Sequence, residues 1–221
     1  MAKILIAIPC MDQVPAPFAQ SLAMIRKGEY ECAVAFQMGS LIYTSRNNLA
    51  TTAFKMEADY VLWLDSDMVF QQDYLLRMMD VMTKNDLDFL TGLYFRRVQP
   101  FSPVLFSKLD LLEDGTGATW EEFEELPDEL FEVAGCGFGA VLIKTDVLFD
   151  VQAQYGTMFN PLTGLGEDIA FCWRARQMGY KIWCDPSIEL GHVGYSVVNG
   201  KFYQSYRAQK LQKGDADEVH R

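Results

Sequence analysis

The sequence predicts an α/β protein with a mostly parallel central sheet. Residues 1–93 alternate between short apolar runs, which favour strands, and amphipathic stretches, which favour helices. Tyr60–Leu64 is an uninterrupted apolar run, as expected for a central parallel strand covered on both faces. Residues 71–83 repeat their apolar side chains at helical spacing. Strands and helices in this order favour one parallel sheet joined by right-handed crossovers.

The first half contains four expected strands and three expected helices. The first strand ends at Pro9, and Gly39-Ser40 opens a helix in which Ile42, Leu49 and Ala53 repeat on one side. A methionine-rich stripe in the third helix is interpreted as core packing. The expected strands are residues 3–9, 30–37, 60–64 and 87–93, and the expected helices are residues 15–27, 39–58 and 71–83.

The second half has a less regular pattern. Glycines at 135–139 lead into an apolar run at 140–143, and a helix is expected over residues 167–178. A short strand is expected at 181–183 and a polar tail after about residue 200. The acidic stretch 110–130 is expected to be a surface excursion. No repeat or linker divides the chain.

Composition limits the functional classes. The chain has 221 residues, enough for one large or two small domains. Its five cysteines contain no C-x-x-C pair, which argues against a disulfide framework and a structural zinc site. No apolar run approaches the roughly 18 residues that span a membrane, and the N-terminal run reads as a strand rather than a signal peptide. We therefore expect a cytoplasmic protein.

The negative charge is concentrated in one segment. The net charge is −11, and residues 110–132 contain ten acids with no Lys or Arg. The chain has no basic footprint of the kind that binds nucleic acid. An anionic ligand would be repelled by the acidic segment unless it binds elsewhere or a cation intervenes.

Asp65-Ser66-Asp67 is the sharpest local signal. It directly follows the strand expected at 60–64, and ligands of open parallel sheets bind beyond the carboxyl ends of strands. Two acids one residue apart in extended chain face the same way, so both can approach one cation. Carboxylates suit Mg²⁺ or Mn²⁺, which can hold a diphosphate. The alternative interpretation is an acidic turn that caps a helix.

Three further patterns carry candidate chemistry. Glu167 and Asp168 begin a helix, where their charges are favoured and a carboxylate can accept a proton. His192 lies between glycines and can complete a metal shell begun by Asp67. Arg46 can contact a base or phosphate through its planar guanidinium. Each has an alternative interpretation. Glu167 and Asp168 can simply complement the charge at the start of a helix, His192 can be a structural histidine, and Arg46 can be a solvated residue on a helix surface.

In this order the patterns resemble the glycosyltransferases of the GT-A fold, especially family 2 and its bacterial and phage relatives. The resemblance covers roughly residues 3–195. It lies in Ile6–Pro9, Thr44–Asn47, Ala58–Asp67, Gly135–Gly139, Gly166–Asp168 with Arg174 and Gly179, and His192. It implies a Rossmann-like three-layer αβα sandwich and a single domain at 1–200. Residues 1–98 would bind the nucleotide and 99–200 the acceptor, with an acidic insertion at 108–132 and a tail at 201–221.

The resemblance also implies roles for individual residues. Asp67 and His192 would bind Mn²⁺ or Mg²⁺, with Asp65 contacting the ribose or the metal through water. Asp168 would be the catalytic base and Glu167 would hold the acceptor. The nucleotide-sugar site would comprise Ile8, Pro9, Arg46, Asp65, Ser66, Asp67 and Gly137.

The implied reaction is transfer of a sugar from a nucleotide diphosphate donor, a UDP-sugar by expectation, to an acceptor hydroxyl with inversion. The sequence does not identify the acceptor, which can be a sugar, a lipid or a protein. The expected second strand ends Ala35-Phe36-Gln37, without the acid that often reads uracil in the family. Two rival functions are a sugar nucleotidyltransferase, disfavoured because no glycine-rich loop follows the first strand, and a non-catalytic nucleotide- or carbohydrate-binding module.

Overall fold

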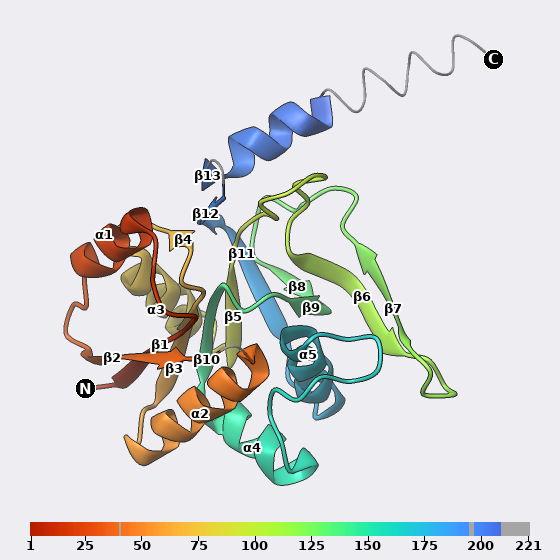
Figure 1. Ribbon diagram of the computed structural model, residues 1–221, viewed down its shortest axis with the longest axis horizontal. Coiled ribbons are helices and arrows are strands. Elements are labelled where there is room, and N and C mark those ends of the chain that lie inside the picture. The colour runs from red at the N-terminus through yellow and green to blue at the C-terminus, as the bar shows by residue number, and fades with distance from the viewer. Residues whose placement is uncertain (40, 195–196, 209–221) are drawn as a thin grey trace.

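A computed structural model describes residues 1–39, 41–194 and 197–208, and shows a mixed α/β fold (Figure 1). The main sheet has seven strands in the order β2-β1-β3-β10-β5-β11-β8. Five run in one direction and two, β10 and β8, run against them. The strands are β1 (Lys3–Cys10), β2 (Glu31–Met38), β3 (Tyr60–Leu64), β5 (Phe89–Leu93), β8 (Phe131–Val133), β10 (Ala140–Lys144) and β11 (Ile182–Glu189).

Helices cover both faces of this sheet. One hydrophobic cluster joins the sheet to α1 and α3, and another joins its other face to α2, α4 and α5. The structure therefore confirms the α/β fold class with a mostly parallel sheet that the alternating sequence pattern predicts. The helices are α1 (Ala16–Met24), α2 (Ile42–Lys55), α3 (Tyr74–Lys84), α4 (Thr145–Tyr155) and α5 (Glu167–Gln177).

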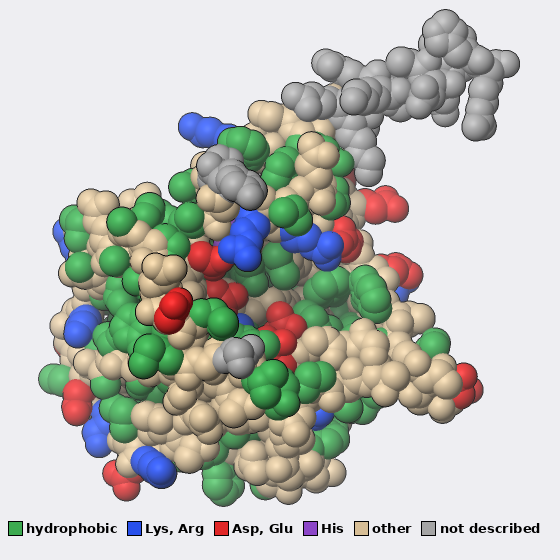
Figure 2. All heavy atoms as spheres, viewed as in Figure 1, with side chains coloured by type: hydrophobic (Ala, Val, Ile, Leu, Met, Phe, Trp, Pro, Cys, Tyr) green, Lys and Arg blue, Asp and Glu red, His purple; other side chains and the backbone are tan. Residues whose placement is uncertain are grey.

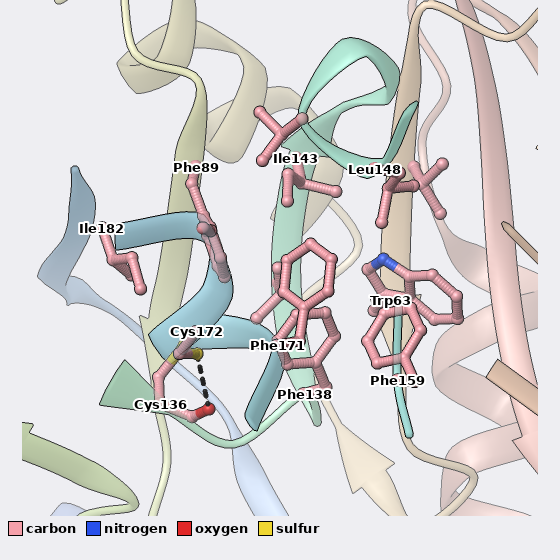
Figure 3. Close-up of a cluster of buried hydrophobic side chains, with 14 of the residues drawn as sticks. Trp63, Phe89, Cys136, Phe138, Ile143, Leu148, Phe159, Phe171, Cys172 and Ile182 are labelled. Atoms are coloured by element: carbon pink, nitrogen blue, oxygen red, sulfur yellow. Dashed lines mark hydrogen bonds between the residues drawn. The ribbon is translucent and has the colours of Figure 1, made fainter. Parts of the chain in front are cut away.

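An aromatic cluster joins the end of β3 to α5 (Figure 3). Phe159 and Phe171 are stacked with ring centroids 4.7 Å apart, and Trp63 meets Phe159 edge-on at 5.1 Å. Phe138, just before β10, packs edge-on against Trp63, Phe159 and Phe171. Each such pair contributes about 0.5–1.5 kcal/mol beyond its buried area. The cluster therefore fixes the start of α5 beside the carboxyl end of β3.

The acidic segment lies at the surface, as expected, and much of it is organised by strand pairing. β6 (Leu105–Leu111) and β7 (Ala118–Glu122) form an antiparallel hairpin, and β6 also pairs with β9 (Gly135–Cys136). β8 then joins the edge of the main sheet beside β11. Backbone pairing organises the segment while most of its acids face water.

Three other differences concern the second half. The sequence pattern gave no indication of α4, and β11 extends to Glu189 rather than ending at 183. Residues 200–208 are helical, so the polar-tail prediction is wrong for them. Tyr203 stacks on Phe95 at 4.9 Å, and Phe101 meets the rings of Phe202 and Tyr206. Residues 209–221 of the expected tail lie outside the described residues.

A small second sheet extends from the end of β3. It contains β4 (Met68–Val69), β12 (Gly191–Val193) and β13 (Val197–Val198), in the order β13-β12-β4. None of the helices in the described ranges is long and apolar enough to cross a membrane.

Candidate functional site

Asp65-Ser66-Asp67 forms a turn between β3 and β4. The Met68 N–H donates to the Asp65 carbonyl at 3.2 Å, which closes the turn. The Asp65 N–H donates to the Gly139 carbonyl at 3.4 Å, so the turn lies beside the connection into β10. All three side chains are partly exposed. The motif therefore occupies the carboxyl end of β3, where ligands of parallel sheets bind.

The second sheet brings His192 to Asp67. His192 pairs with Met68 across β12 and β4, and the Val193 N–H donates to the Asp67 carbonyl at 2.8 Å. His192 Nε2 lies 3.4 Å from Asp67 Oδ2. With Nδ1 protonated, the ring donates to the Phe95 carbonyl at 2.9 Å, which leaves Nε2 facing the carboxylate. Ligating histidines are commonly oriented by such a bond from the other ring nitrogen.

Arg46 lies beneath the site, fully buried. Its Nη2 is 2.8 Å from Asp65 Oδ1, and its Nε is 3.3 Å from Glu167 Oε1. The guanidinium also lies over the rings of Trp63 and Phe138, 5.7 and 5.4 Å from their centroids. The solvated-helix alternative is therefore wrong for Arg46. The side chain ties the turn after β3 to the first residue of α5.

Asp168 follows Glu167 at the start of α5. Burial, reinforced by the charge of Glu167, raises the pKa of Asp168 to about 6, although Arg46 acts in the opposite direction. The Ile169 N–H donates to Asp168 Oδ1 at 2.8 Å. A carboxylate that titrates close to neutral pH is well matched to accept and release a proton.

Asn47 holds the loop that leads to α5. Its Oδ1 accepts from the Phe159 N–H at 3.0 Å, and its Nδ2 donates to Asn160 Oδ1 at 3.0 Å. Arg174 bonds the Met158 carbonyl at 2.9 Å from the other side. Arg46 thus positions Asp65 and Glu167, and Asn47 positions the loop that precedes α5.

Gly137 has a packing reason to be glycine. A Cβ at this position would overlap the hydroxyl of Tyr94 and lie 2.8 Å from Val104 Cγ1. The Tyr94 hydroxyl accepts from the Gly139 N–H at 3.3 Å, and its ring meets His192 edge-on at 5.8 Å. Burial raises the pKa of Tyr94, and the charges of Asp65 and Asp168 add to this. A sugar contact at Gly137 stays a prediction.

Two residues of this region, Tyr94 and Arg97, were not among the site residues predicted from the sequence. Arg97 Nη1 bonds Asp67 Oδ2, the oxygen that His192 also faces. Figure 2 shows acidic side chains gathered in a hollow, with basic side chains next to them. Both residues follow β5, so their place at the carboxyl end of the next parallel strand was an available signal.

The other predicted binding residues are less directly placed. Ile8 and Pro9 are buried near the carboxyl end of β1, so a ligand would meet their backbone rather than their side chains. Ser66 is partly exposed between the two acids. Their contact with a nucleotide stays a prediction.

The Asp67 carboxylate and the His192 imidazole fit a divalent cation whose remaining ligands come from a bound molecule. Among the described residues no group of three or more His, Cys, Asp or Glu side chains is arranged to hold a metal. Asp67 and His192 offer one carboxylate and one imidazole, and the cationic group of Arg97 lies against the same carboxylate oxygen. Such a pair suits Mn²⁺ or Mg²⁺ if a diphosphate supplies the remaining ligands.

Comparison with known proteins identifies the fold alone. No profile of a known protein family matches the chain, and no curated protein sequence matches it. The crystal structure of A197 from STIV does match, with a TM-score of 0.64 and 19% identity. The match covers 88% of this chain and 86% of that one. The shared fold thus extends over most of both chains.

Proposed function

We propose that the chain is a metal-dependent glycosyltransferase of the GT-A type, acting on a nucleotide diphosphate sugar. One observation carries the proposal. Asp67 and His192, the candidate metal ligands, belong to the same region as Asp168, because Arg46 joins Asp65 of the turn to Glu167 of α5. Asp67 lies more than 100 residues before both Asp168 and His192 in the sequence. The match in fold to A197 is consistent with this arrangement but adds no chemistry.

The reaction needs the leaving group to be stabilised on one side of the transferred sugar and the acceptor hydroxyl to be deprotonated on the other. A divalent cation at Asp67 and His192 would supply the charge that makes the nucleoside diphosphate a good leaving group. On the other side, Asp168 accepts the proton of the acceptor hydroxyl as its oxygen bonds the anomeric carbon. The bond from that carbon to the diphosphate oxygen breaks at the same time. In-line displacement of this kind inverts the anomeric centre.

Glu167 and Arg46 act by positioning in this proposal. The ion pair of Arg46 with Glu167 holds the first turn of α5 against the end of β3. Glu167 retains some exposure and can accept a hydrogen bond from an acceptor hydroxyl. The exposed β6–β7 hairpin lies next to the loop that precedes α5, since Gly164 approaches the backbone of Gly117 and Ala118. The acceptor would enter on this side.

Metal-dependent binding of UDP tests the proposal. Titration calorimetry should detect UDP binding with Mn²⁺ present, and affinity should fall by more than about ten-fold in EDTA, equivalent to roughly 1.4 kcal/mol. The diphosphate would otherwise face Asp65 and Asp67 without a screening cation. Asp67→Asn should behave in Mn²⁺ as the wild type does in EDTA. Equal affinity with Mn²⁺ and with EDTA would contradict the metal assignment.

A further inference from the structure

The two acids of the Asp65-Ser66-Asp67 turn have different counter-ions. Asp65 pairs with Arg46, whose side chain is 2% exposed and also bonds Glu167. Asp67 pairs with Arg97, whose side chain is 52% exposed and has no second ion pair among the described residues. The charge of Asp65 is thus neutralised within the protein, whereas Asp67 is neutralised by a group at the surface.

The difference in burial determines which ion pair can open. Separating Arg46 from Asp65 would leave a buried guanidinium with only Glu167 as its partner, which is unfavourable. The Arg97–Asp67 pair is weaker, because water solvates the exposed Arg97 guanidinium once it separates from the partly exposed carboxylate. A ligand that competes for Asp67 therefore meets a small opposing free energy. Asp67 is the acid of the turn that can exchange its partner.

The backbone on both sides of Arg97 is anchored. Phe95 stacks on Tyr203 at 4.9 Å, and Phe101 packs against the rings of Phe202 and Tyr206. These contacts hold the chain around Arg97 beside the site while the long side chain stays exposed. After release from Asp67, the guanidinium would remain within reach of a ligand bound there.

We infer that Arg97 is an exchangeable counter-ion of Asp67: it yields the carboxylate to a divalent cation and then binds the diphosphate of the donor. The inference rests on the proposed function and adds a residue to its binding site. A guanidinium matches the paired oxygens of phosphate groups, so exchange replaces one charge-assisted contact with another. Without donor, Arg97 keeps the acid paired.

Arg96 provides a matched control. It neighbours Arg97 and carries the same charge, but its Nη2 lies 2.9 Å from Glu122 Oε1 on β7 rather than at Asp67. The variants Arg97→Gln and Arg96→Gln therefore remove the same charge from adjacent positions. A general effect of net charge should appear in both, and an effect of the Asp67 contact only in Arg97→Gln.

The first measurement is the affinity for Mn²⁺ alone, followed by the electron paramagnetic resonance signal of the free ion. Arg97→Gln should bind Mn²⁺ roughly two- to ten-fold more tightly than the wild type, because the competing cation is removed. Arg96→Gln should match the wild type. Unchanged or weaker Mn²⁺ binding by Arg97→Gln would overturn the inference.

The second measurement is the affinity for UDP at saturating Mn²⁺, by calorimetry. Arg97→Gln should bind UDP about ten-fold more weakly, since a charge-assisted hydrogen bond to phosphate is lost. Arg97→Lys should recover part of the affinity. Wild-type affinity in Arg97→Gln would show that the side chain does not reach the diphosphate and would overturn the exchange.

The two proposals fail in different ways. If neither the wild type nor Arg97→Gln binds UDP more tightly with Mn²⁺ than in EDTA, the metal-dependent function fails together with the inference. If the wild type binds Mn²⁺ and UDP but Arg97→Gln gives the same constants, only the inference fails. Tighter Mn²⁺ binding in Arg97→Gln with weaker UDP binding is the combination that exchange requires.

Discussion

Asp168 shows how neighbouring residues set the chemistry of a single side chain. Burial and Glu167 raise its pKa, while Arg46 partly opposes them. The site thereby contains one acid, Asp65, that is paired with a buried guanidinium, and a second, Asp168, whose pKa is raised to about 6. A buried acid with a raised pKa is typical of sites that transfer protons.

Removing the proton acceptor should slow transfer strongly while preserving donor binding. Asp168→Asn should lower the rate of sugar transfer by roughly 10²–10⁴-fold, the usual contribution of a positioned base. The base acts when deprotonated, so wild-type kcat/KM should fall as the pH drops through about 6. Initial rates between pH 5 and 8, with calorimetry of UDP binding, check both points.

Glu167→Gln is the matched control at the adjacent position. It should mainly raise the KM for the acceptor, because Glu167 is assigned to holding rather than to proton transfer. Near-normal turnover by Asp168→Asn with an inactive Glu167→Gln would reverse the two roles. Near-normal turnover by both would leave the motif as a charged helix start.

Single residues could be nominated from the sequence, but their surroundings could not. Asp65 and Asp67 stand out because they follow an apolar run, Asp168 because it begins a helix, and His192 because glycines lie on either side of it. The burial of Arg46 could not be read in this way, since the rings around it come from distant segments.

At the scale of elements, the connection from β9 to β10 passes close to the end of β5. Its glycines lie against Tyr94, which directly follows β5 and meets both Gly139 and His192. Glycine at 137 lets this connection approach the ring without a clash. The packing holds the Gly139 carbonyl in reach of the Asp65 N–H, and so helps fix the turn after β3.

A side chain at 137 should therefore destabilise the protein. Gly137→Ala should lower the free energy of unfolding by about 1–3 kcal/mol, the usual cost of overpacking. Gly117→Ala is the control, because its Cβ would meet only Leu112 Cδ1 at 3.4 Å. Tyr94→Phe removes the overlapping oxygen, so the double variant should lose less stability than the sum of the single variants. Additive losses in urea unfolding would contradict this packing.

The elements predicted best are those whose pattern is local. Strand 60–64 and helix 71–83 follow from periodicity within a few residues, and both are found at nearly those positions. β8 pairs with β11 some 50 residues later, and the helical segment 200–208 is held by aromatic contacts with Phe95 and Phe101. Such elements depend on long-range partners that periodicity does not reveal.

Over the whole molecule, the distribution of charge limits how an anionic donor can bind. The net charge is −11, and the turn after β3 adds two acids at the proposed diphosphate site. A negatively charged donor needs positive charge there, for which Arg97 and a divalent cation are the proposed sources. The α/β class and the motif order were predictable from the sequence. The exchangeable pair at Asp67 depends on side-chain exposure, which only the fold reveals.

Hydrolysis of nucleotide sugars distinguishes a metal-dependent glycosyltransferase from a protein that shares only its fold. With Mn²⁺ and water as acceptor, nucleotide release should be measured for UDP-, GDP-, CMP- and dTDP-sugars. UDP should be released slowly from UDP-sugars, and this release should be lost in EDTA and in Asp67→Asn, because both changes remove the cation that stabilises the leaving group. Release from none of the donors above the Asp67→Asn background, or release unaffected by EDTA, would contradict a metal-dependent glycosyltransferase.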